Sequence, residues 1–156
     1  MAKIKHILIV TRSTHYCKAA VDYGLSLAKE NQAKATVIHS IYNPFHLKGI
    51  NMALTSLPML EDEYTRMQEE ARNDLDRMIE KEKSEGLEVE VVIGHGEPDE
   101  DILNIVREKG IDLLVLRAHE EGVVEHLIYG RANEKLIRKM PCSILLVKDE
   151  PGARVS

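Results

Sequence analysis

The sequence predicts an α/β protein with an open, mostly parallel sheet of five strands and helices on both faces. Three observations lead to this class. Five short runs rich in apolar and β-branched residues occur along the chain, and stretches with apolar residues at helical spacing lie between them. Strands and helices therefore alternate, which is typical of parallel sheets with right-handed crossovers. The 156 residues fit one domain, expected over residues 1–149, with a mobile tail over residues 150–156.

The chain begins with a strand that suits burial on both faces, HILIVT at residues 6–11. Ser13 or Thr14 is a suitable N-cap for the next helix. The apolar positions of that helix are Cys17, Ala20, Val21, Leu25 and Ala28. A β-branched second strand is predicted over residues 35–42, and a longer loop over residues 43–58.

The clearest helix in the sequence spans residues 60–84. Its apolar residues recur three and four apart, at Leu60, Tyr64, Met67, Ala71, Leu75, Met78 and Ile79. The charged residues between them are expected to form a solvated face, and Gly86 ends the helix. A third strand is predicted over residues 87–94, and its initial alternation of apolar and charged residues favours a place at or near an edge.

The second half of the chain repeats this alternation. Pro98 is suited to the start of a helix that Gly110 ends. A buried strand over residues 112–117 follows. A short basic helix is expected over residues 130–140, and a last apolar strand over residues 142–148.

Composition and charge exclude several classes of function. The formal net charge is −5, and the chain has one Phe and no Trp, so we expect no nucleic acid partner. Cys17 and Cys142 lie far apart with no CxxC spacing, which is typical of reduced thiols inside the cell. No uninterrupted apolar run approaches the length that spans a bilayer. We therefore expect a cytoplasmic protein without membrane insertion.

Several motifs, in their order and spacing, resemble the universal stress protein family over nearly the whole chain. They are HILIVT, ATVIHSI, GHGEPDEDIL, GIDLLVLRAH and GRANEKLIRKMPCSILLVK. The resemblance implies a Rossmann-like parallel sheet of order 3-2-1-4-5, of the adenine nucleotide alpha hydrolase-like fold, and a non-enzymatic role in stress response. It also implies a homodimer formed through the last strand, with an interface at Cys142, Ile144, Leu145, Leu146 and Val147. Such pairing would cover an apolar edge strand that is otherwise prone to aggregate.

The nucleotide-binding branch of that family has a signature of the form G-x2-G-x9-G-[S/T] after the fourth strand. Without gaps, its four positions fall on Arg117, Glu120, Gly130 and Arg131. Only Gly130 matches. Where that branch tends to have an Asp ending the first strand and a small apolar residue beside the adenine, this chain has Thr11 and Ser40. The resemblance therefore implies a degenerate nucleotide site.

These departures weaken polyphosphate binding for physical reasons. Glycines let backbone amides approach phosphate oxygens, whereas Arg117 and Glu120 add side chains and restrict positive φ. A carboxylate about 4 Å from a phosphate charge costs about 4 kcal/mol at a surface-like dielectric, which is roughly a thousandfold in affinity. Glu120 and Glu121 could instead pair with the arginines when nothing is bound. In the alternative, side-chain donors and the helix after Gly130 bind ATP or AMP. The contacts would then be Thr11, Arg12, Ser13, Ser40, Arg117, Gly130 and Arg131.

Histidines gather near the expected carboxyl ends of the strands, at His15, His39, His95 and His119. A divalent metal or a proton-sensing role could use such a group. No pair has a metal-motif spacing, so solvated or hydrogen-bonded side chains explain them more simply and we expect no metal site. No nucleophile motif occurs either, and helix capping accounts for Ser13 and Thr14. We expect no catalytic residue, and a nucleotide hydrolase is the third hypothesis.

A protein partner is also consistent with the sequence. An apolar stretch near the second connection contains Met52, Leu54, Leu57, Met59 and Leu60. It is either a lid over the strand ends or a recognition surface for an unidentified protein. The sequence as a whole predicts a non-enzymatic, cytoplasmic, homodimeric regulatory protein without a cofactor. The alternative is a regulator that binds ATP or AMP through a remodelled loop.

Overall fold

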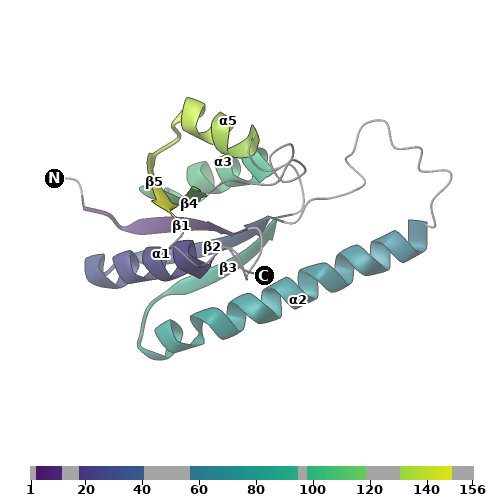
Figure 1. Cartoon of the computed structure of the whole chain (residues 1–156). Helices are drawn as coiled ribbons and strands as arrows, with labels where there is room; N and C mark the ends of the chain where they lie inside the picture. The colour runs from purple at the N-terminus through teal and green to yellow at the C-terminus, as the bar shows by residue number, and fades with distance from the viewer. Residues whose placement is uncertain (1–2, 12–17, 41–56, 95–97, 119–130, 149–156) are drawn as a thin grey trace.

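The computed structural model describes residues 3–11, 18–40, 57–94, 98–118 and 131–148. Within them, five parallel strands form one sheet of order β3-β2-β1-β4-β5 (Figure 1). The strands are β1 (His6–Thr11), β2 (Lys34–Ser40), β3 (Val89–Gly94), β4 (Leu113–Ala118) and β5 (Ser143–Lys148). The helices are α1 (Lys18–Asn31), α2 (Leu57–Ser84), α3 (Pro98–Lys109) and α5 (Arg131–Lys139). The predicted fold class and strand order are confirmed.

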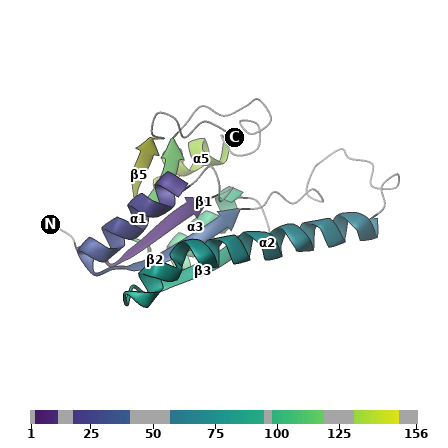
Figure 2. The ribbon, with the colours of Figure 1, turned by 60° about the horizontal axis from the view of Figure 1, so that its bottom comes forward.

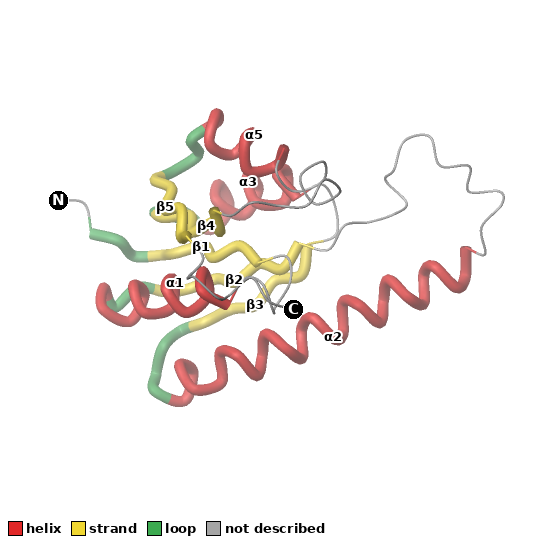
Figure 3. The backbone as a smooth tube through the Cα atoms, viewed as in Figure 1, coloured by secondary structure: helices red, strands yellow, loops and turns green. Residues whose placement is uncertain are grey.

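Helices cover both faces of the sheet, as predicted. α1 and α2 lie on one face, and α3 and α5 lie on the other (Figures 2 and 3). The buried side chains form two corresponding clusters. Ile9 and Leu75 belong to the first, and Leu8 and Leu136 belong to the second. Because the central strands are buried on both faces, their sequences are continuous apolar runs, whereas the edge strand β3 begins with alternation.

β1 is the central strand, and its pairing sets the register of its neighbours. Residues 6–11 of β1 pair with residues 34–39 of β2. On the other side, residues 7–9 pair with residues 113–115 of β4. All five strands are parallel, so their carboxyl ends lie at the same edge of the sheet.

α2 begins earlier than the sequence predicted. Its first residue is Leu57, so the last two residues of the loop predicted over residues 43–58 belong to the helix. Pro58 lies in the first turn of the helix, where its missing N–H has no intrahelical partner to lose and its fixed φ suits the helix. The remaining residues of that loop lie outside the described part of the chain.

The apolar positions of α2 face the core along most of the helix, and Tyr64 in its first half packs partly against the first cluster. Ala71, Leu75 and Ile79 are buried, but Met67 is 46% exposed. The first half of the helix, to which Met67 belongs, extends beyond the ends of the strands (Figure 1). Met67 therefore has the predicted helical spacing without the burial of Ala71 and Leu75.

Glycines end two helices where the sequence predicted. Gly86 has a φ of 95°, and the backbone N–H of Leu87 donates to the carbonyl of Glu82 at 3.0 Å. Gly110, with a φ of 63°, has the same role after α3. Because Leu87 belongs to this helix cap, β3 begins at Val89 rather than at residue 87.

Some expected features lie outside the described residues: the caps Ser13 and Thr14, the core residue Cys17 and the tail over residues 150–156. Within the described part of the chain, no helix combines the length and the apolar character needed to cross a membrane.

α1 approaches β1 closely through a buried glycine. A Cβ atom built on Gly24 would lie 2.5 Å from Cγ1 and 2.6 Å from Cδ1 of Ile9, which is closer than packed carbon atoms approach. The absence of a side chain at Gly24 therefore sets the distance between helix and sheet.

We expect Gly24→Ala to lower the free energy of unfolding by about 1–3 kcal/mol, because the new methyl group overpacks the core. Urea unfolding measures the loss. Ile9→Ala removes both clashing atoms, so the double variant should lose less than the two single variants together. Strictly additive losses would show that Ile9 does not limit the packing of α1.

Candidate functional site

The candidate site lies at the carboxyl ends of the central strands. The chain runs from β1 to β2 and β3 in one direction and then continues with β4 on the other side of β1. This reversal makes the edge between β1 and β4 the switch point, where ligands of open α/β sheets bind.

Three buried polar side chains form a row across this edge. Thr11 lies opposite His39 in the register of β1 and β2. Arg117 lies two residues beyond Val115, the partner of Ile9. Strand alternation places all three on the face that α1 and α2 cover, which is the face of Ile9 and Val115. Their exposed fractions are 0% for Thr11, 6% for His39 and 9% for Arg117.

Arg117 is the chemically most unusual member of the row. It is a nine-tenths buried cation in β4, and it takes part in a polar or electrostatic interaction. Its strand partner in β5 is Val147, so β4 and β5 are still paired at this position. A guanidinium side chain thus occupies space beside the switch point, and such a group offers donors to an anion.

His39 is uncharged at neutral pH. Burial lowers the pKa of its imidazole from 6.5 to about 4, and the negative charge of Asp74 on α2 opposes this shift only in part. The Nδ1 atom is buried and has no hydrogen-bond partner. The expectation that His39 is solvated or hydrogen-bonded is therefore wrong for this nitrogen. A buried polar atom without a partner costs stability, so packing alone does not explain its presence.

Ser40 lies on the opposite face of the sheet from His39. It is 2% exposed, and its Oγ atom also lacks a hydrogen-bond partner. In the register it faces Gly94 of β3, and a Cβ atom on Gly94 would lie 2.8 Å from Oδ2 of Asp101. The carboxyl end of β2 thus holds a buried polar group on each face of the sheet.

Several predicted site residues are not brought together here. Arg12, Ser13 and Gly130 lie outside the described residues. Arg131 is the first residue of α5, which agrees with a helix start after the predicted loop. The side chain of Arg131 lies outside the described part of the structure. The same holds for three of the histidines considered for metal binding, His15, His95 and His119. Within the described residues, no cluster of three or more His, Cys, Asp or Glu could hold a metal ion.

The residues predicted for a dimer interface lie on β5, at an edge of the sheet. Val147 is 8% exposed, and Leu145 packs partly against the same core. Ile144 and Cys142 pack partly against the other core. Leu146 is 48% exposed. Leu146 is therefore the member of this group whose side chain is most available to a partner.

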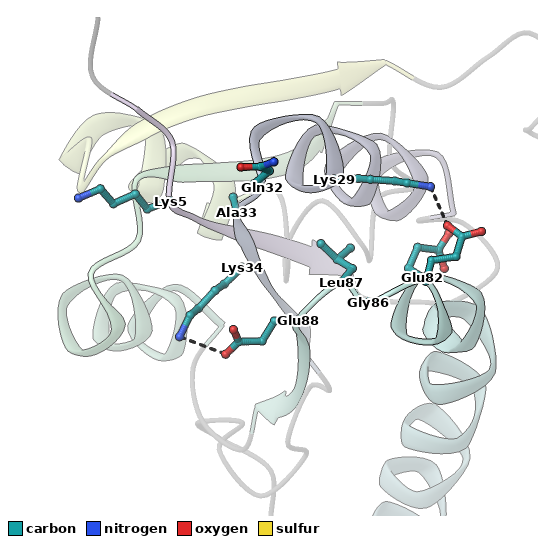
Figure 4. A pocket seen from close by; sticks show the side chains of 10 residues that line it. Lys5, Lys29, Gln32, Ala33, Lys34, Glu82, Gly86, Leu87 and Glu88 are labelled. Atoms are coloured by element: carbon teal, nitrogen blue, oxygen red, sulfur yellow. Dashed lines mark hydrogen bonds and ion pairs between the residues drawn. The ribbon is translucent and has the colours of Figure 1, made fainter.

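A surface pocket of about 540 Å³ lies at the opposite, amino-terminal end of the strands (Figure 4). Four of its charged residues form two ion pairs, whereas Oε2 of Glu82 is buried without a hydrogen-bond partner. Nζ of Lys29 lies 2.7 Å from Glu85, and Nζ of Lys34 lies 3.1 Å from Glu88. Exposed ion pairs of this kind contribute little stability. This end of the sheet is not where the sequence predicted a ligand.

Comparison with known proteins finds a family that matches nearly the whole chain. The profile described as the universal stress protein family matches residues 3–148. The chain belongs to the universal stress protein family. Among curated relatives, universal stress protein YxiE of Bacillus subtilis is 24% identical over 146 residues, which cover 91% of this chain and 97% of the relative.

Solved universal stress protein structures share the fold. The structure of protein MJ0577, from Methanocaldococcus jannaschii, superposes with a TM-score of 0.74 at 20% identity, covering 97% of this chain and all of that one. A universal stress protein solved in complex with cAMP superposes with a TM-score of 0.58 at 18% identity, covering 96% of this chain and all of that one. At these identities, the two superpositions establish the fold alone.

The lowered pKa of His39 predicts acid sensitivity. An unfolded chain would bind a proton at this imidazole near pH 6.5, whereas the folded chain binds it only near pH 4. The contribution of neutral His39 is therefore complete above pH 6.5 and is lost as the pH falls towards 4, by up to about 3 kcal/mol. Urea unfolding at a series of pH values measures this loss.

In the same series, His39→Leu should flatten the pH dependence between 6.5 and 4. The control is Val37→Ala, a buried position two residues earlier on the same face of β2, which removes core contacts but no titratable group. That variant should keep the wild-type slope. An unchanged slope in His39→Leu would assign the acid sensitivity to other groups.

Proposed function

We propose that this universal stress protein is a non-enzymatic, cytoplasmic regulatory protein that acts as a homodimer and does not hold ATP tightly. The single observation that carries the nucleotide part of the proposal is the burial of Arg117 beside the switch point. In the nucleotide-binding branch of the family, a glycine would stand at this position. A buried guanidinium side chain fills volume that a glycine leaves open.

Charge supports the same proposal. Glu120 and Glu121 follow β4 in the sequence at the positions where that branch keeps its phosphate loop. A triphosphate carries several negative charges, so nearby carboxylates oppose its binding more strongly than that of a monoanion. The proposal therefore separates ATP from ligands with less charge.

The alternative is a regulator that binds a mononucleotide through side-chain donors. One observation favours it: a family member with the same fold was solved in complex with cAMP. The donors would be Arg117, Arg131 and the helix amino terminus after Gly130. A cyclic monophosphate has one negative charge, so nearby glutamates repel it less than they repel a triphosphate, and two arginines can donate to it.

Calorimetric titration of the purified protein with ATP, AMP and cAMP tests both proposals. We expect wild-type protein to bind ATP no more tightly than about 1 mM. Glu120→Gly, and Glu120→Gly combined with Arg117→Gly, should each strengthen ATP binding by about tenfold or more as charge and bulk are removed. Arg107→Gly, an exposed arginine on α3, is the control and should change nothing.

Micromolar ATP binding by the wild type would contradict the leading proposal. Binding of cAMP or AMP without ATP binding would support the alternative. Phosphate release during the same titrations would support the hydrolase hypothesis, which the leading proposal rejects. Glu120→Gly keeps the test valid if replacement of buried Arg117 prevents folding.

Homodimerisation is supported by the position and chemistry of β5. The strand is apolar, it ends the sheet, and Leu146 on it is 48% exposed. Unpaired edge strands of this kind invite pairing with another strand, and a second β5 would continue the sheet across both copies. Val147 is a poor site for a test because a charge in its buried position would disrupt the core.

We expect Leu146→Glu to convert the dimer to monomers in sedimentation, because each copy would then bring a charged side chain into the β5 interface. Asn73→Glu is the matched control, since Asn73 is exposed on α2, which packs against β3 at the opposite edge of the sheet. Circular dichroism should show folded protein in both variants. A folded Leu146→Glu variant that remains dimeric would place the interface elsewhere.

A further inference from the structure

The first half of α2 forms an acidic arm, defined here as residues 61–70. It extends beyond the strand ends (Figures 1 and 2) and contains five acidic side chains and one basic side chain. Arg66 lies 2.7 Å from Glu63 and 4.0 Å from Glu70. The other three acids of the arm form no ion pair with any described residue; they are Glu61, Asp62 and Glu69.

The arm also carries uncovered apolar surface. Met67 continues the stripe that Ala71 and Leu75 bury against the sheet, yet it is 46% exposed. A solvated helix surface has no need of an apolar residue at this position. The acidic arm thus combines unpaired negative charge with an exposed methionine, a side chain that adapts readily to a partner surface.

The end of α5 forms a basic corner, defined as Ile137, Arg138, Lys139 and Met140. All four side chains are exposed, Ile137 by 42% and Met140 by 57%. Arg138 and Lys139 have no ion pair within the described residues, whereas the preceding cation, Lys135, lies 3.3 Å from Asp99. Cations at a helix carboxyl end favour the helix dipole, but that role does not require exposed apolar neighbours.

The two surfaces complement each other in charge but do not meet within one chain. α2 packs against the edge strand β3 on one face of the sheet. α5 packs with α3 on the opposite face (Figure 3). The sheet therefore separates the acidic arm from the basic corner of the same molecule.

We propose that the acidic arm of one copy docks on the basic corner of a second copy. Because the two surfaces differ, the contact is heterologous and runs head to tail, so it builds species larger than a dimer. One helix face against one helix end buries less area than a stable interface needs, so the contact is weak and depends on concentration and salt. The contact requires neither nucleotide nor pairing through β5.

Sedimentation velocity over a range of protein concentrations tests the proposal. We expect species larger than the basic unit at about 0.1 M salt, where the Debye length is about 10 Å, and their loss at about 1 M, where it is about 3 Å. Measuring them in the Leu146→Glu background separates this contact from pairing through β5. If no larger species form at low salt and high concentration, the proposal is wrong.

Charge reversal identifies the two surfaces. Arg138→Glu with Lys139→Glu, or Glu61→Lys with Asp62→Lys, should each weaken the association by about tenfold or more. The quadruple variant reverses the charge at these four positions on both surfaces and should regain part of the association. Asp76→Lys with Glu80→Lys makes the same charge change on an exposed part of α2 outside the arm, and it should leave the association intact.

Two outcomes overturn the proposal. If the arm and corner variants associate like the wild type, the two surfaces are not in contact. If both weaken association but the quadruple variant does not regain it, the arm and the corner each serve another macromolecule rather than a second copy.

Discussion

The pairing of β1 with β2 on one side and β4 on the other is the constraint on which the rest of the structure depends. It brings strand ends from distant parts of the sequence to one edge and requires helices on both faces. The close approach of α1 at Gly24 shows how little tolerance this arrangement leaves at its centre. The same pairing places Thr11, His39 and Arg117 in one row, although 78 residues separate the last two.

Most of the fold follows from the sequence because its signals are local. Apolar runs mark the central strands, and Gly86 and Gly110 mark helix ends through positive φ. The exposure of Met67 could not be predicted in the same way, because it depends on what packs against α2 rather than on helical spacing. The start of α2 was missed for another reason: Pro58 is equally suited to a loop and to a first helical turn.

The candidate site was predictable only in part. The sequence placed Thr11, Ser40 and Arg117 at strand ends, and alternation along each strand assigned them to faces once the register was known. It did not show that the Nδ1 atom of His39 lacks a partner, because that depends on the packing of α2 over β2. Hydrogen bonding within a buried site is a property of three-dimensional contacts, and a single sequence contains no direct signal for it.

The two ends of the sheet differ in how deeply their polar side chains are buried. At the amino-terminal end, Lys29–Glu85 and Lys34–Glu88 form exposed ion pairs, and Oε2 of Glu82 is buried without a hydrogen-bond partner. At the carboxyl end, His39 and Ser40 hold buried atoms without hydrogen bonds, at a cost of about 1–3 kcal/mol each. Apolar residues would avoid that cost, so stability does not account for these side chains. Under the proposed function, a small ligand bound at the switch point would give these two side chains hydrogen-bond partners.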